Sequence, residues 1–369
     1  MPRALITGIT GQDGLYLSEL LLEREYDVYG LIRGQNNPKR DLVERAVPGV
    51  RLLTGDLTDL SSLIRALNAA QPDEVYNLGA ISFVAYSWEN ARLTSEVTGL
   101  GVLNMLEAAR LYAGTDMSRV RFYQASSSEM FGATPPPQNE LTPFHPRSPY
   151  GVAKVYAYWM TRNYREAYGM YAVNGILFNH ESPRRGETFL TRKVSLAVGR
   201  IKAGLDKELY LGNLDAARDW GYAKEYVEGM WRMLQAPEPS DYVLATGTAY
   251  TVREFVEVAF DHVGLDWQKY VQFDERHVRP AEVDNLIGDA SKAESLLGWS
   301  PRVLMHDLAR LMVDADCEAA MAQAAQQSVY DERGWRARRV DRTATSATRS
   351  HHEVSDDHRR VRPVVVATP

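Results

Sequence analysis

The 369-residue chain holds little cysteine and no long apolar run. Cys317 is the only cysteine, so no disulfide framework exists and we expect a reducing, cytoplasmic location. No apolar stretch approaches the roughly 20 residues of a membrane-spanning helix. The first residues run directly into a strand pattern, without the charged and then apolar layout of a secretion signal. We therefore expect a soluble protein without a membrane partner.

The chain also has fewer basic residues than acidic ones, 42 against 48. The formal net charge is -6, which argues against a nucleic-acid-binding surface, and we expect no nucleic acid partner. Hydrophobic residues make up 45% of the chain, as in ordinary globular proteins. From Asp331 onward lysine is missing, arginine is abundant and apolar residues are few. Such a segment cannot bury enough surface to order itself, so we expect residues 331–369 to form a disordered, Arg-rich tail.

Strand and helix patterns alternate along the first half of the chain. Apolar strand patterns cover Arg3–Thr7, Asp27–Ile32, Val50–Leu53, Glu74–Leu78, Val120–Tyr123 and Ala172–Leu177, and helical patterns cover Leu15–Leu22, Leu60–Ala69, Asn90–Ala113 and the segment from Tyr150. This alternation predicts the α/β class with a doubly wound parallel (Rossmann) sheet. We expect residues 1–178 to form a Rossmann domain, to which a strand near 242–246 returns. Residues 179–330 then form mainly a smaller, C-terminal substrate-binding lobe.

Three glycines mark the corner between the first strand and the first helix. The loop contains Gly8, Gly11 and Gly14, together with Thr10, Gln12 and Asp13. Glycines here allow a tight turn and let backbone N–H groups approach a pyrophosphate, which predicts dinucleotide binding. Arg33 ends the second strand, where a residue that reads the ribose belongs, and an arginine suits the 2′-phosphate of NADP. The alternative for Arg33 is a solvated basic loop.

Further residues follow the third and fourth strands, at the edge where ligands bind in open α/β sheets. Asp56 precedes Leu57 and could accept a hydrogen bond from an adenine amino group, or cap a helix. Asp59 is the better cap for the helix that follows. Leu78 ends the fourth strand, Ala80 and Ser82 follow it, and the three complete the expected cofactor crevice.

Four side chains with catalytic chemistry follow the fifth strand. Ser127 and Glu129 come directly after it, and Tyr150 and Lys154 begin a helical pattern at a spacing that places them on one face. A nearby ammonium favours a phenolate, so we expect Lys154 to lower the pKa of Tyr150. A phenol tuned in this way can take a proton from a sugar hydroxyl. The alternative is an interface aromatic beside a solvated lysine.

The glycine loop, the Ser-Ser-Ser-Glu run and the Tyr150/Lys154 pair together resemble the extended short-chain dehydrogenase/reductase family of nucleotide-sugar enzymes, and within it the GDP-mannose 4,6-dehydratases. The segments that carry this resemblance are residues 6–14, Phe178–Gly186 (FNHESPRRG), Thr191–Lys193, Leu211–Asn213, Arg218–Trp220 and Arg279–Asp284. The Arg-rich tail lies outside it.

The resemblance implies a role for each matching residue. It implies that Ser127, Glu129, Tyr150 and Lys154 are catalytic, and that His180 and Arg185, with Tyr150 and Lys154, contact NADP. GDP-mannose would be bound by Ser82, Asn179, Lys193, Arg218, Arg279 and Glu282, and we expect no metal ion. The implied reaction oxidises C4, eliminates water across C5 and C6 and returns the hydride to C6. The implied assembly is a homodimer through the Asn90–Ala113 and Tyr150–Tyr168 helices, with a homotetramer as the alternative.

Three kinds of rival remain open at this point. Sibling enzymes fit less well. A dTDP-glucose 4,6-dehydratase would be expected to have an aspartate where Ser128 stands. An epimerase or a 4-keto reductase needs no base at the position of Glu129. The same chemistry on another GDP-sugar, such as a GDP-manno-heptose, is not excluded by any residue. A non-catalytic NADP-binding regulator would be expected to lose Tyr150, Lys154 or Glu129, and all three are present.

Overall fold

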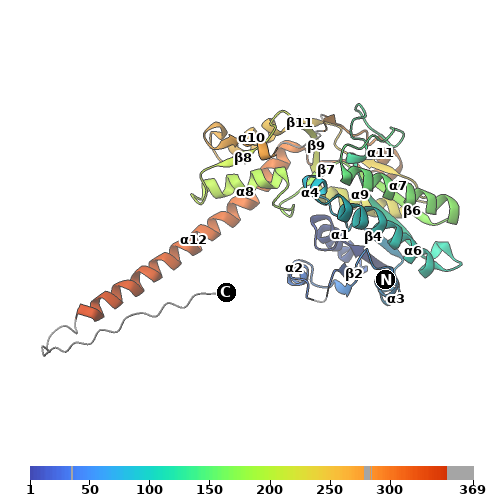
Figure 1. Ribbon diagram of the computed structural model, residues 1–369, viewed down its shortest axis with the longest axis horizontal. Helices are drawn as coiled ribbons and strands as arrows, with labels where there is room; N and C mark the ends of the chain where they lie inside the picture. Colours follow the sequence, from blue (N-terminus) through green and yellow to red (C-terminus); the bar gives the residue numbers. More distant parts are fainter. Residues whose placement is uncertain (35, 278–282, 284, 347–369) are drawn as a thin grey trace, which may run out of the picture. The chain divides into compact units, whose positions relative to one another are not determined.

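The computed structural model describes residues 1–34, 36–277, 283 and 285–346. It divides into two compact units, Met1–Met321 and Ala322–Pro369. The fold that positions the candidate site lies in the first unit, and the elements below are labelled as in Figure 1.

A seven-stranded sheet organises the first unit (Figure 1). Every pair of neighbouring strands is parallel, in the order β10-β6-β5-β4-β1-β2-β3. The strands are β1 (Arg3–Thr7), β2 (Asp27–Ile32), β3 (Arg51–Thr54), β4 (Glu74–Asn77), β5 (Arg121–Ser127), β6 (Tyr171–Leu177) and β10 (Tyr242–Leu244). The predicted doubly wound sheet and the returning strand near residue 242 are confirmed. The strand order reverses between β1 and β4, which is the point where ligands bind in such sheets.

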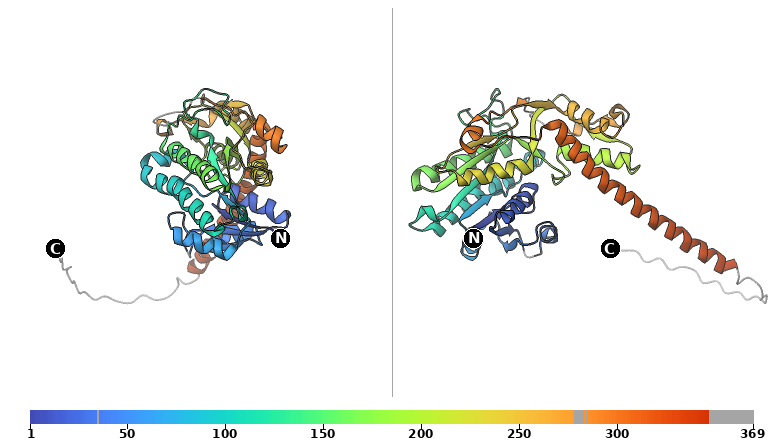
Figure 2. Two further views of the ribbon diagram at one scale, coloured as in Figure 1. Left: turned by 90° about the vertical axis from the view of Figure 1, so that its right-hand side faces the viewer. Right: turned by 180° about the vertical axis from the view of Figure 1, so that it is seen from behind.

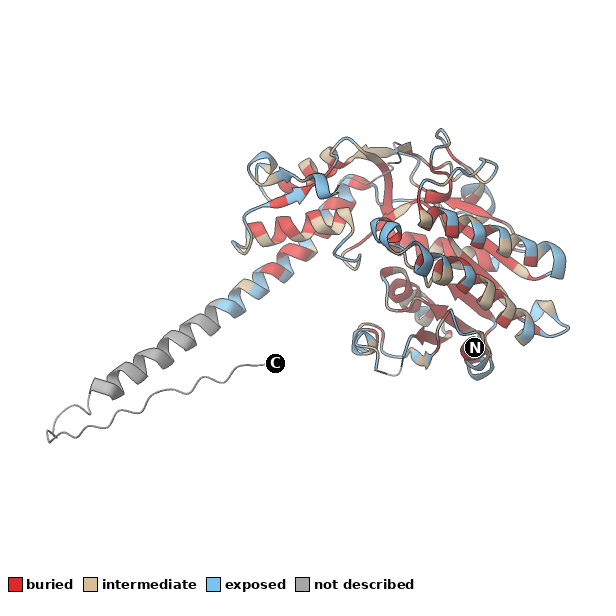
Figure 3. Cartoon of the chain, viewed as in Figure 1, coloured by how far each residue is buried: buried red, intermediate tan, exposed pale blue. Residues whose placement is uncertain are grey.

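Helices cover both faces of this sheet (Figure 2). On one face α1 (Gln12–Glu23) packs beside α9 (Ala223–Gln235), and their apolar side chains share a core cluster with Ile6 and Val28. On the other face lie α3 (Leu60–Ala70), α6 (Gly101–Ala113) and α7 (Pro149–Tyr168), whose side chains bury Leu5 and Val75. Figure 3 shows most of these strands buried between the two layers, whereas the edge strand β3 is partly exposed. Shorter helices at the rim are α2 (Arg40–Ala46) and the 3-10 turn η2 (Met117–Arg119).

The helix expected over Asn90–Ala113 is confirmed, and it contains a π-helical segment. After the short helix α4 (Val84–Glu89), the chain is helical without a break through α5 (Ala91–Thr94), the π-helical segment η1 (Ser95–Leu100) and α6. The hydroxyl of Thr98 accepts a hydrogen bond from the backbone N–H of Ile81 at 3.0 Å, so this segment is tied to the loop after β4. A Cβ on Gly101 would lie 2.9 Å from Cβ of Leu57, so α6 begins in close contact with the loop after β3. π-helical turns of this kind are frequent beside functional sites.

The remaining elements of the first unit build a second core. Strands β7 (Asn179–Glu181), β9 (Ala217–Tyr222), β11 (Ala249–Thr251) and β13 (Asn285–Leu286) form one small sheet, and β8 (Leu209–Leu211) pairs with β12 (Val271–Phe273). Helices α8 (Leu190–Lys202), α10 (Val252–Asp261) and the start of α12 pack around Trp220 and Phe255. The short helix η4 (Trp267–Lys269) packs on this second core, and η5 (Glu275–His277) follows β12. Helix α11 (Ser291–Leu297) packs instead against α9 and β10 of the first core. The boundary at residue 178 stays a prediction.

The last helix corrects the expected tail. Helix α12 runs from Met305 to Ser346, so residues 331–346 are helical where we expected disorder. The helix begun at Met305 continues through this stretch, in which arginine and alanine are strong helix formers, although the stretch is too polar to form a core. The rest of the expected tail, residues 347–369, lies outside the described residues. Among the helices that are described, none is long and apolar enough to cross a membrane.

Candidate active site

The glycine loop is built for close contact with a ligand. Gly8 has a φ of +70°, and a Cβ there would lie 2.8 Å from the backbone nitrogen of Gly79. A Cβ on Gly14 would lie 2.6 Å from the carbonyl oxygen of Gly8, so α1 packs tightly on the end of β1. Gly11 precedes α1 and no side chain among the described residues caps this helix. The first N–H groups of α1 therefore form an anion site of the kind that binds a pyrophosphate.

The loops after β1 and β4 are joined at the switch point of the sheet. The hydroxyl of Thr7 donates to Oδ1 of Asn77 at 2.7 Å and accepts from the backbone N–H of Gly79 at 2.9 Å. The buried side chain of Leu57 lies against Gly79. Beyond this point Leu78 and Ala80 are partly buried and Ser82 is exposed. The residues predicted to contact the cofactor therefore lie at or beside the loops that meet at this switch point.

The two residues expected to read the adenosine part lie at the ends of β2 and β3. Arg33 is exposed directly after β2, and its carbonyl oxygen accepts a hydrogen bond from the side chain of Asn37. Asp56 Oδ1 accepts from both the backbone N–H and the hydroxyl of Thr58, which orders the turn before α3. Asp59 caps α3 by accepting from the N–H groups of Ser61 and Ser62, as predicted.

The four predicted catalytic residues gather where β5 meets the start of α7. Ser148 caps α7 by accepting from the N–H of Gly151, which fixes the helix start one residue after the cap. Ser127 hydrogen-bonds the phenol of Tyr150, and the charge of Glu129 acts on the same phenol. Nζ of Lys154 lies 5.7 Å from the ring centroid of Tyr150 and donates to the carbonyl oxygen of Ala125 at 2.6 Å. Strand β5, the 3-10 turn η3 (Ser128–Met130) and helix α7 thus bring a hydroxyl, a carboxylate, a phenol and an amine together.

Burial changes the acidity expected for Tyr150 and Lys154. Burial raises the pKa of Tyr150 to about 12, although the hydrogen bond from Ser127 and the charge of Arg185 act in the opposite direction. Burial likewise lowers the pKa of Lys154 to about 8, against the influence of Asp13. We expected a lowered pKa for Tyr150 because of Lys154, and this prediction is wrong, since the pKa of Tyr150 in the folded protein is raised. Burial is the largest cause for both groups, because low-polarity surroundings disfavour the charged form of each.

An ion pair joins the glycine loop to the segment after β6. Nε2 of His180 lies 2.9 Å from Oδ2 of Asp13, and Nδ1 lies 2.8 Å from the carbonyl oxygen of Phe178. Both ring nitrogens face acceptors, so the imidazolium form satisfies both. Burial would lower the pKa of His180, but Asp13 outweighs it and raises the pKa above its usual value. The ring of His180 also stacks on Tyr226 at 4.8 Å.

The same segment is held by neutral hydrogen bonds and by a second ion pair. The side-chain amide of Gln12 donates to the carbonyl oxygen of His180 at 2.7 Å and accepts from the hydroxyl of Ser182 at 2.8 Å. Arg185 lies 3.2 Å from the buried carboxylate of Glu181 and covers the ring of Phe189. Gln12, Asp13, His180 and Arg185, all predicted cofactor contacts, thus form one connected group.

Comparison with known proteins agrees with this geometry. Residues 5–312 match the model of the family described as GDP-mannose 4,6 dehydratase. The chain belongs to this family. It is 55% identical to GDP-mannose 4,6 dehydratase 1 of Arabidopsis thaliana, over 86% of this chain and 90% of the plant protein. It is 48% identical to the GDP-mannose 4,6-dehydratase of Yersinia enterocolitica, over 88% and 96% of the two chains.

Solved structures support the fold of this dehydratase family member. The UDP-glucose 4-epimerase of Thermus thermophilus, solved in complex with NAD, is 28% identical and superimposes with a TM-score of 0.74. The superposition covers 85% of this chain and 98% of the epimerase. The resemblance to nucleotide-sugar enzymes of the short-chain dehydrogenase/reductase type, which the sequence motifs indicated, is therefore confirmed.

The predicted substrate residues of this dehydratase family member are only partly described. Asn179 begins β7, and the buried Arg218 lies in β9, where its guanidinium donates to the carbonyl oxygen of Ala217. Lys193 in α8 donates to the carbonyl oxygen of Tyr210 at 2.6 Å, and burial lowers its pKa. Arg279 and Glu282 lie outside the described residues. Among the residues that are described, no group of three or more His, Cys, Asp or Glu side chains is arranged to hold a metal ion.

Two residues that shape the site were not predicted from the sequence. The carbonyl oxygen of Ala125 receives the amine of Lys154, but backbone acceptors leave no mark on a sequence. Glu181 binds the hydroxyl of Thr191 at 2.6 Å and pairs with Arg185. Glu181 lies within the FNHESPRRG segment, between the predicted cofactor contacts His180 and Arg185. This position was the one sequence feature that could have indicated its part in the site.

Proposed function

We propose that this protein dehydrates GDP-mannose to GDP-4-keto-6-deoxymannose. The observation that carries the proposal is the cluster of Ser127, Glu129, Tyr150 and Lys154 beside the glycine loop. Membership of the GDP-mannose 4,6-dehydratase family supports the choice of substrate. The epimerase of similar fold binds NAD, and the glycine cradle at Gly8 and Gly14 fits a dinucleotide. When bound, a nicotinamide cofactor takes a hydride from C4 of the sugar and returns it to C6.

Each catalytic side chain has a proposed task in proton transfer. Tyr150 takes the proton of the C4 hydroxyl, while Ser127, its hydrogen-bond partner, orients the C4 oxygen. The C4 ketone acidifies the proton on C5, which Glu129 removes. Glu129 then protonates the departing C6 hydroxyl, so that water leaves and a 4-keto-5,6-ene remains. Tyr150 returns a proton to C5 at the end. Lys154, anchored on Ala125, holds a positive charge below the phenol ring.

We propose Gln12, Asp13, His180 and Arg185 as cofactor-binding residues and Asn179, Lys193 and Arg218 as residues that contact the GDP-sugar. The first four form the connected group between the glycine loop and β7. The cationic side chains of Lys193 and Arg218 suit a diphosphate.

The preferred cofactor in this proposal is NADP. Arg33 directly follows β2, and its exposed guanidinium can pair with a 2′-phosphate, whereas an NAD-binding site usually has an acidic residue there.

We further propose a homodimer formed by α6 and α7, which lie side by side in Figure 1. Large apolar side chains are exposed on these helices and on the segment before them, with Val152 55% and Trp159 52% exposed. Exposed large apolar side chains on two neighbouring helices suit a protein interface. A cytoplasmic location stays a prediction that rests on the single cysteine.

One assay tests the proposed reaction. Purified protein with NADP is incubated with GDP-mannose, and the product is examined by mass spectrometry. We expect the mass to fall by one water without net accumulation of reduced cofactor, and the same loss to disappear with Tyr150→Phe. An unchanged substrate mass would overturn the proposal, and faster turnover of a GDP-manno-heptose would reassign the substrate.

A further inference from the structure

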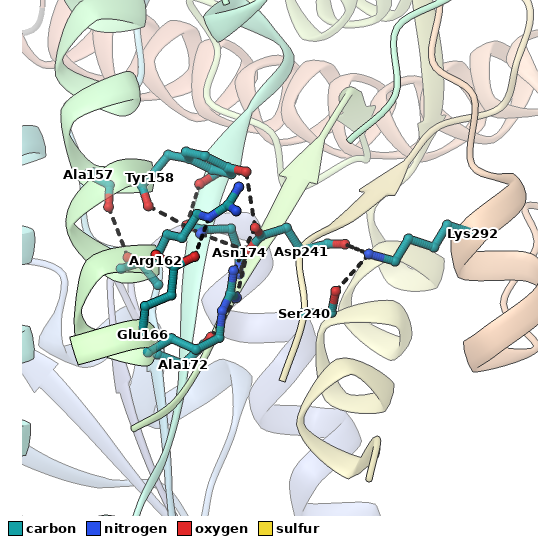
Figure 4. Close-up of polar contacts among 12 residues, drawn as sticks. Ala157, Tyr158, Arg162, Glu166, Ala172, Asn174, Ser240, Asp241 and Lys292 are labelled. Atoms are coloured by element: carbon teal, nitrogen blue, oxygen red, sulfur yellow. Dashed lines mark hydrogen bonds and ion pairs between the residues drawn. The ribbon is translucent and has the colours of Figure 1, made fainter. Parts of the chain in front are cut away.

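Asp241, just before β10, holds a buried carboxylate that takes no part in the proposed reaction (Figure 4). Asp241 as a whole is only 6% exposed. Oδ1 accepts from Nη1 of Arg165 at 2.9 Å, and from the backbone and side-chain nitrogens of Asn174 at 3.2 and 2.9 Å. Oδ2 accepts from Nη2 of Arg165 at 2.8 Å and from the hydroxyl of Tyr158 at 3.0 Å. Burial would raise the pKa of Asp241, but Arg165 and the other donors outweigh it and lower the pKa.

Two of these donors belong to the helix that carries the catalytic phenol. Tyr158 lies four residues after Lys154 and eight after Tyr150, so the three side chains follow one face of α7. Figure 4 shows Tyr158 and Asp241 pointing toward each other. Arg165, nearly two turns further along the helix, forms a bidentate pair with the same carboxylate. Asp241 therefore fixes both the rotation of α7 and its position along the sheet.

The third donor leads to the strand that carries Ser127. Asn174 is buried in β6, and its Oδ1 accepts a hydrogen bond from the hydroxyl of Ser126 at 3.1 Å. Ser126 precedes Ser127 in β5. The chain of contacts thus runs from Asp241 to Asn174 and then to the residue beside Ser127. One carboxylate is therefore linked both to Ser126, the neighbour of Ser127 in β5, and to α7, the helix that carries Tyr150.

A further contact fixes Asp241 itself. Nζ of Lys292 donates to the backbone carbonyl oxygen of Asp241 at 2.8 Å and to the hydroxyl of Ser240 at 2.7 Å, as Figure 4 shows. Lys292 belongs to α11, so the segment before β10 is held from a second side.

We propose that Asp241 is a positioning residue for the dehydration, which sets the hydroxyl of Tyr150 against Ser127 by fixing α7 relative to β5 and β6. The inference rests on the proposed role of Tyr150. Because a shift of about 1 Å between reacting groups can cost about a hundredfold in rate, a buried clamp on the helix acts on kcat rather than on substrate binding. The proposed sugar contacts at Asn179, Lys193 and Arg218 do not touch Asp241.

The decisive variant is Asp241→Asn, which keeps the shape but replaces one acceptor oxygen by a donor nitrogen. That nitrogen faces Arg165 and, depending on its position, either Tyr158 or Asn174, so one arm of the clamp is broken. We expect kcat to fall about ten- to a hundredfold while KM for GDP-mannose changes less than about threefold. Tyr158→Phe removes only the phenol arm, and we expect a smaller fall in kcat with the same unchanged KM.

The matched control is Glu74→Gln. Glu74 is also a buried carboxylate, which accepts from Tyr26, Tyr76 and Gln235, but it lies at the amino end of β4, away from the catalytic edge of the sheet. We expect it to lower the melting temperature as Asp241→Asn does but to leave kcat unchanged. Equal losses of kcat in both variants, or wild-type kcat in Asp241→Asn, would overturn the inference.

A crystal structure of Asp241→Asn separates this inference from the proposed function. We expect the phenol of Tyr150 to move out of hydrogen-bonding reach of Ser127. An unchanged Tyr150–Ser127 contact overturns the positioning role, whatever the activity of the wild-type protein. If Asp241→Asn does not fold, the structure and kinetics of Tyr158→Phe decide in the same way. A wild-type protein that leaves GDP-mannose unchanged overturns the proposed function alone.

Discussion

The imidazole of His180 lies 2.9 Å from the carboxylate of Asp13, and this pair joins the glycine loop to the first strand of the second core. The charge of Asp13 also raises the pKa of both Lys154 and Tyr150, so the loop and the catalytic helix share one electrostatic environment. The folded-state pKa of Asp13 is lowered and that of His180 is raised. The pair therefore stabilises the fold between these two pKa values, and the stabilisation is lost as the pH falls through the former or rises through the latter.

The stability of the protein should depend on pH through Lys154. Its pKa is about 8 in the folded protein and 10.5 when unperturbed, so between these values the unfolded chain binds more protons and stability rises with pH. Lys154→Met lacks this dependence. We expect the wild type to gain up to about 3 kcal/mol of unfolding free energy relative to the variant between about pH 7 and about pH 10.5, measured by urea unfolding. Parallel pH profiles would show that Lys154 is not held at a lowered pKa.

Glu129→Gln should separate oxidation from water loss. A glutamine can neither remove the C5 proton nor protonate the departing hydroxyl, so we expect dehydration to fall about a hundredfold or more, while slow oxidation at C4 continues. Product mass and the absorbance of reduced nicotinamide follow the two steps. Glu89→Gln, at an exposed position in α4, is the control and should behave as the wild type. Formation of the 6-deoxy product at the normal rate would remove Glu129 from the mechanism.

The parts of this site that the sequence predicts are those fixed by near neighbours in the chain. The glycine corner after β1 and the cap at Asp59 depend on contacts within a few residues, and both are found as predicted. The clamp at Asp241 joins residues 67 to 83 positions apart, and no local pattern marks it. The pKa of Tyr150 was mispredicted for the same reason. The Tyr-Lys spacing is visible in the sequence, whereas the burial that dominates the pKa is a property of the tertiary structure.

Arg33→Asp should weaken the binding of NADP more than that of NAD. The change replaces a cation that can pair with the 2′-phosphate by an anion that repels it, and the loss of a charge-assisted hydrogen bond corresponds to about ten- to a hundredfold in Kd. Fluorescence titration with both cofactors measures the difference. Arg65→Asp makes the same charge change at a 71% exposed side chain of α3 and should leave both affinities unchanged. Equal affinities of Arg33→Asp and wild type for NADP would show that Arg33 does not bind the 2′-phosphate.

Trp159→Glu should break the proposed dimer. The substitution places a charge within the apolar patch on α6 and α7, where burial without a partner is costly. We expect sedimentation velocity to show a monomer for this variant and a dimer for the wild type. Leu296→Glu, at a similarly exposed apolar position in α11, is the control and should remain dimeric. A monomeric wild type would contradict the interface outright.

Deleting the residues after Asp331 should leave the activity and the melting temperature intact. Helix α12 contacts the second core through buried side chains, among them Met305, Leu308, Met312 and Cys317, and all of its residues known to be buried lie at or before Ala320. The truncated helix keeps every one of these contacts. The deleted segment is poor in apolar residues and contributes no part of the described core. Loss of turnover or a fall of several degrees in the melting temperature would show that the Arg-rich segment supports the folded enzyme after all.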